Sequence, residues 1–215
     1  MTEADYLRHI GAQVKLSSRR WGVLTFEAAK LSPAVDGDLV VYVDPLATDR
    51  PLVRIHSECI FGEAFESSFC DCADQFRMAM LRICQSGSGI LFYLRLDGRG
   101  AGLTAKVKAT DLELKGYDTF ESRVAIGVEP EDRDFRPVAK FLSDKGIRAV
   151  RLLTNNPDKA SQLRSVGIDV EVDRLIITNP NRHVKKLYET KRDRFGHDIP
   201  PEALLDPQLS FNFDE

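Results

Sequence analysis

The chain has 215 residues, enough for one well-formed core, and 43% hydrophobic with 29% charged residues is an ordinary globular composition. Its 30 basic and 33 acidic residues give a net charge of −3, which argues against a general nucleic-acid binder because such proteins usually carry a basic excess. The apolar stretches are too short to span a membrane, and the N-terminal residues lack the apolar core of a signal peptide, so we expect a cytoplasmic protein without a membrane partner.

The first part of the chain is predicted to be rich in strands. Branched and aromatic residues predict strands over 21–28, 38–44 and 52–56, which we assign to one sheet. Over 74–85 apolar residues recur at helical spacing and predict a helix. The segment 89–95 then reads as a buried strand that ends in the glycine-rich turn DGRGAG.

Strands and helices alternate in the second part of the chain. The elements expected here are helices within 103–115, 119–126, 136–145, 155–167 and 181–196, and strands over 149–154 and 168–173. The predicted fold class is therefore α/β, of the mixed α+β kind, with a β-rich N-terminal part followed by strand–helix units. We expect a single domain over 1–198. Three prolines and an acidic end predict that the tail over 199–215 is extended or disordered.

Three of the four cysteines, Cys59, Cys70 and Cys72, lie within the stretch CIFGEAFESSFCDC. In a reducing compartment such a cluster is more typical of metal binding or catalysis than of disulfides, although three unrelated thiols are the alternative. Three protein ligands on zinc leave a position for water, as in catalytic sites, whereas four mark a structural site. Cys84 is the only candidate for a fourth thiolate, but it shares an apolar helix face and we interpret it as a core residue. His56 is a weaker candidate.

Three polar motifs follow, and each has a structural explanation by itself. RLDGRGAG fits neither the P-loop nor the dinucleotide pattern and favours a tight turn, although Arg95 and Arg99 suit an anionic ligand. TNNPDK is typical of a helix N-cap with proline, a place where Lys159 and free N–H groups also favour an anion. In EPEDRDF (129–135) four acids surround Arg133, which is typical of a charged surface.

Together, and in this order, these motifs resemble GTP cyclohydrolase II, the first enzyme of riboflavin biosynthesis. The matching stretches, within about residues 20 to 195, are VRIHSECIFGEAFESSFCDC, YLRLDGRGAGL, GYDT and RLLTNNPDK. The resemblance implies a GTP cyclohydrolase II-like fold with a zinc-binding loop. It also implies a hydrolase that opens the imidazole ring of GTP and releases formate and pyrophosphate, with one Zn²⁺ per chain, Mg²⁺ on the nucleotide, and a homodimer.

The resemblance also assigns roles to single residues. Cys59, Cys70 and Cys72 match the zinc ligands, and zinc-bound water with a lowered pKa would attack C8 of the purine. Arg133 matches the arginine proposed to attack the α-phosphate so that pyrophosphate leaves, and Glu131 matches the catalytic aspartate. The positions that match substrate contacts are Arg54, Glu58, Gln75, Asp97, Arg99, Thr110, Thr119, Thr154 and Lys159.

Three of these positions depart from the family pattern. Asp97 stands where the turn usually has the glutamate thought to read the guanine edge, and lost pairing to a buried donor costs about 1–3 kcal/mol. Thr110 replaces a tyrosine, and Glu131 replaces the aspartate. These changes predict, as an alternative, a specialised paralogue in secondary metabolism or base catabolism. It would act on another purine or pyrimidine nucleotide, or stop at a formylated or pyrophosphate-release product. A zinc-braced nucleotide sensor without turnover is a third hypothesis, and it predicts a fourth zinc ligand.

Overall fold

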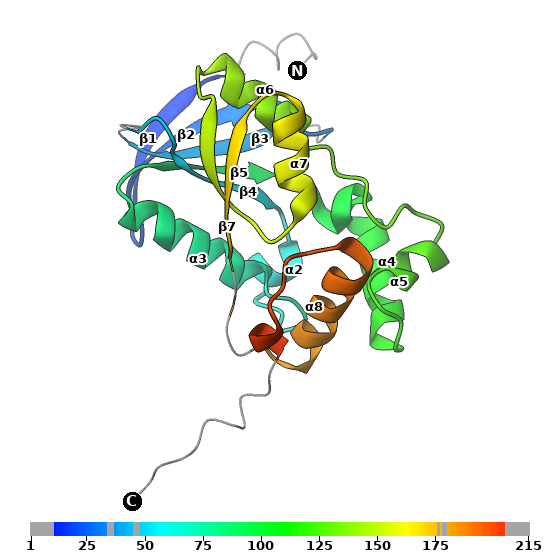
Figure 1. Cartoon of the computed structure of the whole chain (residues 1–215). Helices are drawn as coiled ribbons and strands as arrows, with labels where there is room; N and C mark the ends of the chain where they lie inside the picture. Colours follow the sequence, from blue (N-terminus) through cyan, green and yellow to red (C-terminus); the bar gives the residue numbers. More distant parts are fainter. Residues whose placement is uncertain (1–10, 34–36, 45–47, 176, 178–179, 205–215) are drawn as a thin grey trace, which may run out of the picture.

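The structure is a computed structural model that describes residues 11–33, 37–44, 48–175, 177 and 180–204 (Figure 1). Within these residues seven strands form one sheet in the order β1-β2-β3-β5-β4-β6-β7. The strands are β1 (Gln13–Ser18), β2 (Gly22–Ala29), β3 (Asp38–Val43), β4 (Leu52–Ser57), β5 (Gly89–Leu94), β6 (Ala149–Leu153) and β7 (Asp169–Asp173).

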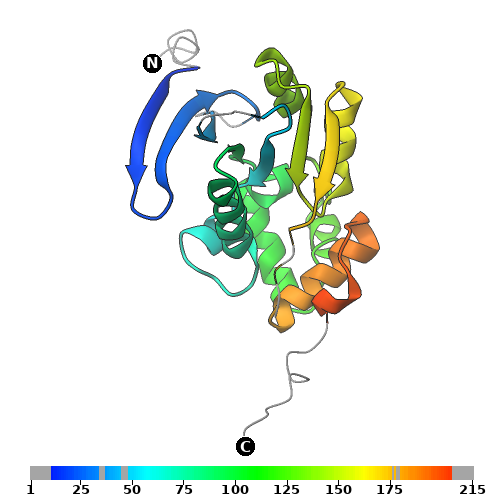
Figure 2. The same ribbon diagram turned by 60° about the vertical axis from the view of Figure 1, so that its left-hand side comes forward.

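The two halves of this sheet differ in strand direction. Neighbours are antiparallel from β1 through β2 and β3 to β5, whereas β5, β4, β6 and β7 are parallel. Figure 2 shows β1 to β3 at one edge of the sheet and β6 and β7 at the other. Parallel neighbours need crossover connections, and helices supply them between β4 and β5 and between β6 and β7. The carboxyl ends of β4, β5 and β6 therefore lie at the same edge.

Helices cover both faces of the sheet. They are α2 (Ile60–Glu63), α3 (Cys72–Gln85), α4 (Gly102–Leu114), α5 (Glu121–Ala125), α6 (Arg136–Asp144), α7 (Pro157–Ser165) and α8 (Arg182–Phe195), with 3₁₀ turns η1 (Asp97–Gly100) and η2 (Pro201–Leu204). Because successive side chains of a strand point to opposite faces, Phe92 packs with α6 and α7 while Leu91 packs with α3. α4, α5 and α8 lie together beyond one end of the sheet (Figure 1).

The mixed α/β fold expected from the sequence is confirmed, and the predicted strands and helices occur with ends shifted by a few residues. β1 and α2 were not predicted. The residues of β1 are exposed up to the last one, so its sequence shows no buried face from which a strand could be inferred. Among the described helices, none has both the length and the apolar character that crossing a bilayer requires.

The expectation of an extended or disordered tail from residue 199 is wrong for its first six residues. Residues 201–204 form η2, and Ile199 and Ala203 are buried against Val184 and Tyr188 of α8. Pro201 is the first residue of η2, a position that proline favours, and the short turn lets both apolar side chains pack on α8. Residues 205–215 lie outside the described residues.

Candidate functional site

A cavity of about 440 Å³ lies at the carboxyl ends of β4, β5 and β6. Part of its wall is formed by residues that come shortly after these strands in sequence. Cys59 follows β4, Asp97 follows β5 and Thr154 follows β6. The predicted site residues that line it are Arg54, Glu58, Cys59, Cys70, Cys72, Gln75, Asp97, Arg99, Thr110, Thr119, Arg133, Thr154 and Lys159. Glu131 contacts two of these residues, Arg99 and Arg133. The fold thus brings the predicted residues together, while the roles assigned to them stay predictions.

The three predicted thiol ligands meet at one end of this cavity. The sulfur atoms of Cys59, Cys70 and Cys72 lie within 4.8 Å of one another. Cys59 immediately precedes α2 and Cys72 is the first residue of α3. The short segment between these two positions therefore brings the sulfurs together. Gly62 permits this packing, because a Cβ atom there would lie 3.0 Å from the Cys70 sulfur. Three converging sulfurs are a donor set that fits zinc.

Neither candidate for a fourth ligand reaches the thiol cluster. Cys84 packs in the core beneath α3, and its sulfur lies 3.7 Å from the Trp21 carbonyl oxygen, as the sequence interpretation expects. His56 interacts with another residue instead, since its Nε2 lies 2.7 Å from the Glu63 carboxylate. That carboxylate also accepts a hydrogen bond from the Cys59 backbone N–H at 2.9 Å. Within the described residues the cluster therefore offers three thiols, which is the number of protein ligands in an open zinc site.

Lys106 of α4 connects the thiol cluster to the glycine turn, and the sequence analysis missed it. Its Nζ donates to the Cys59 sulfur at 3.0 Å and to the Asp97 carboxylate at 2.5 Å. Hydrogen bonds from Cys70 and Cys72, followed by that of Lys106, lower the pKa of the Cys59 thiol. A lysine inside a helix resembles a surface charge in sequence. Its one signal is the spacing i, i+4, i+7 with Thr110 and Glu113, which also line the cavity.

The glycine turn begins beside the thiol cluster, where Asp97 accepts from Lys106, and continues to the acidic loop, against which it packs. Gly98 and Arg99 both have left-handed backbone, with φ of 63° and 57°, and for an arginine this conformation is strained. Gly100 allows close approach, because a Cβ there would lie 3.1 Å from the Asp132 carbonyl oxygen. The Asp132 N–H donates to the Arg99 carbonyl. Arg99 and Arg133, which sequence reasoning placed in separate turns, therefore face one cavity.

Glu131 is held between these two arginines. Its carboxylate accepts from Arg133 Nε at 2.6 Å and from Arg99 Nη1 at 3.3 Å, and Arg133 Nη2 adds a further short contact. Burial opposes ionisation, but the hydrogen bonds and charges of the two arginines outweigh it and lower the pKa of Glu131 to about 2. At neutral pH this side chain is a carboxylate that orients Arg133.

Two further cations are buried in the wall without a carboxylate partner among the described residues. Arg54 donates to the Leu153 carbonyl and the Gln75 side chain, and Lys159 donates to the Ile55 carbonyl at 2.8 Å. Burial lowers the pKa of Arg54 to about 10, and burial followed by the charge of Arg54 lowers that of Lys159 well below its usual value. Buried cations in this arrangement favour an anionic ligand.

The TNNPDK motif forms the expected N-cap and also faces the cavity. The Asn156 side chain accepts from the Asp158 N–H at 2.9 Å and so caps α7. Thr154 and Lys159 on either side of the cap line the cavity. The structural and the functional interpretation of this motif are therefore compatible.

Helix α8 closes the cavity from the side opposite the sheet and is tied to the thiol loop. Tyr188 donates to the Asp71 carboxylate at 2.6 Å, and Lys191 lies 3.4 Å from its other oxygen. Asp71 stands between the ligands Cys70 and Cys72. From the sequence this segment is predicted only as a helix, because a charged helix is usually solvated and nothing local marks its partner.

The chain matches the family model for GTP cyclohydrolase II over residues 13–175. A GTP cyclohydrolase-2 of Teredinibacter turnerae is 41% identical over 82% of this chain and 89% of the relative. A GTP cyclohydrolase-2 of Neisseria meningitidis serogroup A is 39% identical over 82% and 90%. The riboflavin biosynthesis protein RibBA of Bacillus subtilis is 39% identical over 80% of this chain, which spans only 44% of that protein.

The chain belongs to the GTP cyclohydrolase II family. The resemblance inferred from the motif order is thereby confirmed, and the chain is an enzyme of the GTP cyclohydrolase II type.

Within the GTP cyclohydrolase II framework, Asp97 is one of the three positions that we expect to differ from the family pattern, and its contacts are defined. Its carboxylate accepts from Lys106, from the Gly98 N–H at 2.7 Å and from the Ile60 N–H at 3.2 Å. A carboxylate offers about four lone-pair positions, so about one is left. Thr110 lines the cavity, one helical turn beyond Lys106.

Proposed function

We propose that this protein is a zinc-dependent hydrolase that opens the imidazole ring of GTP and releases formate and pyrophosphate, as the first step of riboflavin biosynthesis. One observation carries the proposal: a single cavity joins a three-thiol cluster to a group of buried cations. The riboflavin assignment is supported by the name of the Bacillus subtilis relative. A volume of about 440 Å³ lies within the usual range of about 300–1,000 Å³ for small-molecule sites.

At the thiol end, Cys59, Cys70 and Cys72 would hold one Zn²⁺ per chain. When bound, zinc would supply a Lewis acid and a water whose lowered pKa makes it a nucleophile at neutral pH. Lys106 would offset part of the negative charge of three thiolates through its contact with Cys59. Asp71 and Glu63 hold the loop itself, by accepting from Tyr188 and from the Cys59 N–H.

At the cation end, Arg99, Arg133 and Lys159 would bind the triphosphate, with Mg²⁺ held by phosphate oxygens and water. Arg133 is proposed to attack the α-phosphorus through a guanidinium nitrogen. The N–P bond would form as the bond to the bridging oxygen breaks, pyrophosphate would leave with the proton of that nitrogen, and water would later cleave the N–P bond. Glu131 orients the guanidinium through paired hydrogen bonds. Its pKa of about 2 suits this orienting role better than that of a proton acceptor.

A specialised paralogue is the second candidate, and Asp97 favours it. Guanine presents two adjacent donors, N1–H and the 2-amino group, which a carboxylate reads with two acceptor positions. Asp97 has about one position left after its contacts with Lys106, Gly98 and Ile60. With Thr110 in place of a tyrosine, the protein would then act on another purine or pyrimidine nucleotide, or stop at a formylated or pyrophosphate-release product.

A cytoplasmic homodimer is part of the proposal. Four free cysteines suit a reducing compartment. Exposed apolar side chains on α4 and α5 support association of two copies, and they are Leu103, Val107, Leu114 and Val124. The proposal includes no nucleic-acid or membrane partner.

The test is the product of turnover. Zinc-loaded protein is incubated with GTP and Mg²⁺, and mass spectrometry follows formate, pyrophosphate and the ring-opened pyrimidine. All three products support the full reaction. A formylated pyrimidine with pyrophosphate, or turnover of a different nucleotide in a panel, supports the paralogue. Absence of pyrophosphate and formate from every nucleotide rejects both hydrolase assignments.

A further inference from the structure

His197 lies at the point where the chain leaves α8 and turns back over the cavity. The helix ends at Gly196, whose left-handed backbone (φ 63°) allows the turn, and the His197 N–H donates to the Lys191 carbonyl at 3.0 Å. The next residue is fixed as well, because the Asp198 N–H donates to the Asn155 carbonyl at 2.9 Å. The backbone on both sides of His197 is therefore anchored.

The imidazole of His197 lines the cavity and has one unused polar atom. Its Nε2 is buried and has no hydrogen-bond partner among the described residues. A buried donor or acceptor without a partner costs about 1–3 kcal/mol. Such an atom at a cavity wall is explained when a ligand supplies the missing partner.

Four cations line the same cavity as this imidazole, and together with burial they keep it uncharged. Burial lowers the pKa of His197 most, and the charges of four cations lower it further, to about 2. These cations are Lys191, Arg99, Lys159 and Arg133. The ring is therefore neutral at physiological pH, and in the tautomer with the proton on Nε2 it donates a hydrogen bond. A partner that is stable among four cations is an anion with acceptor oxygens.

The position of α8 places His197 at the cation end of the cavity. Phe195, two residues earlier, lies over the Arg99 guanidinium with its ring centroid 4.1 Å away. Lys191, one turn further back, reaches Asp71 beside the thiol ligands. One helix therefore links the thiol loop to the group of cations that includes Arg99 and Arg133.

We propose that His197 is a substrate-contacting residue, whose Nε2–H donates to a phosphate oxygen of the bound nucleoside triphosphate. This rests on the proposed function for the identity of the ligand. It goes beyond the family match, which ends at residue 175 and does not include α8. The proposal also accounts for the position of α8. A charged helix is usually solvated, but here it folds over the cavity and completes the wall that binds the phosphates.

Binding of inorganic tripolyphosphate tests the contact apart from catalysis. Dissociation constants are measured by calorimetry on the full-length, zinc-loaded chain for wild type, His197→Ala, His197→Asn and His197→Gln. Loss of one hydrogen bond to a charged group predicts about tenfold weaker binding for His197→Ala. Glutamine places an N–H near the position of Nε2 and retains most of the affinity, whereas the shorter asparagine behaves as alanine does.

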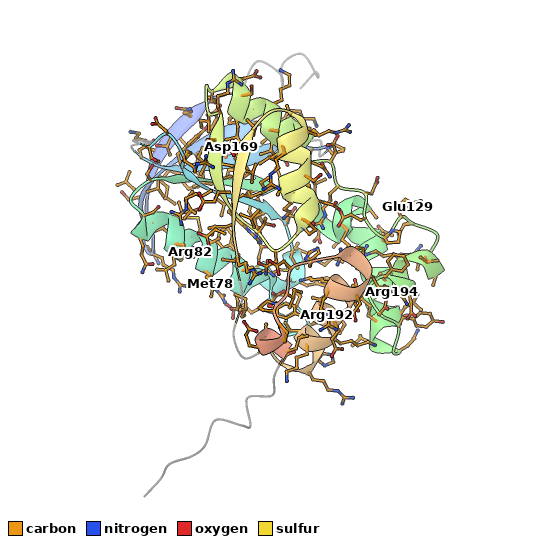
Figure 3. The ribbon with its side chains drawn as sticks, viewed as in Figure 1. Met78, Arg82, Glu129, Asp169, Arg192 and Arg194 are labelled. Atoms are coloured by element: carbon orange, nitrogen blue, oxygen red, sulfur yellow. The ribbon has the colours of Figure 1, made fainter. Side chains whose placement is uncertain are left out.

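Arg192→Ala is the matched control. Arg192 lies on the same helix (Figure 3), is exposed and contacts Asp193, so binding is expected to stay at the wild-type level. Zinc content and thermal unfolding establish that each variant is folded. If His197→Ala does not fold, the glutamine and asparagine variants decide the matter, since equal affinity in these two overturns the proposal.

The outcome also separates this inference from the proposed function. If wild type converts GTP but His197→Ala binds tripolyphosphate as wild type does, the contact is wrong and the function stands. If wild type converts no nucleotide but tripolyphosphate binding still depends on His197, the anion contact stands and the proposed function fails.

Discussion

The two ends of the cavity carry opposite charge and are built from different parts of the chain. At the thiol end, Cys59, Cys70 and Cys72 meet one cation, Lys106. At the other end the carboxylate of Glu131 faces a group of cations, which comprises Arg99, Arg133 and Lys159. The first end suits a metal cation and the second suits an anionic ligand. Under the proposed function, the substrate would direct its reactive ring toward the metal and its phosphate chain toward the arginines.

Removal of one thiol ligand is expected to have the largest effect on turnover. It should abolish zinc binding at the thiol end and leave anion binding at the cation end unchanged. Cys72→Ala leaves two sulfurs, so bound zinc should fall from about one per chain to near zero and turnover should disappear. Tripolyphosphate binding should stay close to wild type. Zinc is measured by elemental mass spectrometry, with Cys84→Ala as the control, because Cys84 lies in the core near Trp21. Full zinc occupancy in Cys72→Ala contradicts the assignment of the ligands.

The opposite change removes a cation from the phosphate end. Arg133→Met should weaken tripolyphosphate binding by about a hundredfold, because it removes a charged hydrogen-bond donor and leaves Glu131 facing the ligand. Zinc content should not change. Calorimetry and zinc analysis are compared with Arg136→Met, an exposed arginine paired with Asp134. A variant that loses zinc as well as anion affinity would show that the two ends are not independent.

Lys106 contacts both the thiol cluster and the glycine turn, and its effect on the metal should be smaller. Lys106→Met removes a donor to Cys59 and is expected to weaken zinc binding by about tenfold, since partners of ligand atoms contribute about 10–100-fold in metal affinity. Competition with a chelator measures the affinity, and Lys108→Met on the exposed side of α4 is the control. Unchanged zinc affinity would limit Lys106 to holding Asp97.

The smallest effect concerns the pH dependence of folding. The pKa of His197 is lowered to about 2 in the folded chain, whereas the unfolded chain has the ordinary value of about 6.5. Below about pH 6.5 the unfolded state therefore binds a proton that the folded state does not. As a result, stability falls with pH down to the folded pKa, by at most about 1.4 kcal/mol per pH unit. His197→Gln should show a shallower fall between pH 6.5 and 5 in denaturant titrations. Parallel curves would mean that the pKa of His197 is the same in the folded and the unfolded chain.

The core and the thiol cluster could be predicted from sequence because their signals are local. Apolar runs mark β4 and β5, helical spacing marks α3, and the three cysteines are close in sequence. The parallel pairing of these strands then places the residues that follow them at one edge, so motifs far apart in the chain meet there.

The cavity residues that were not predicted from sequence make contacts with residues far away in the chain, and no local sequence pattern reveals such contacts. Lys106 reaches Cys59 across 47 positions, and Tyr188 reaches Asp71 across 117. Both lie in helices that look like solvated surface in sequence. The unpartnered nitrogen of His197 becomes evident only when the surrounding cations are placed around it. The exposed strand β1 has no buried face to reveal it.

The most direct test of a cavity with a metal-binding end and an anion-binding end is to measure turnover as a function of bound zinc. Wild-type protein is stripped of metal, reloaded with increasing Zn²⁺, and incubated with GTP and Mg²⁺ while mass spectrometry records the pyrimidine product and pyrophosphate. We predict that ring opening rises in proportion to zinc and saturates at about one Zn²⁺ per chain. Ring opening at full rate in the metal-free protein would contradict the assignment of the thiol end to chemistry.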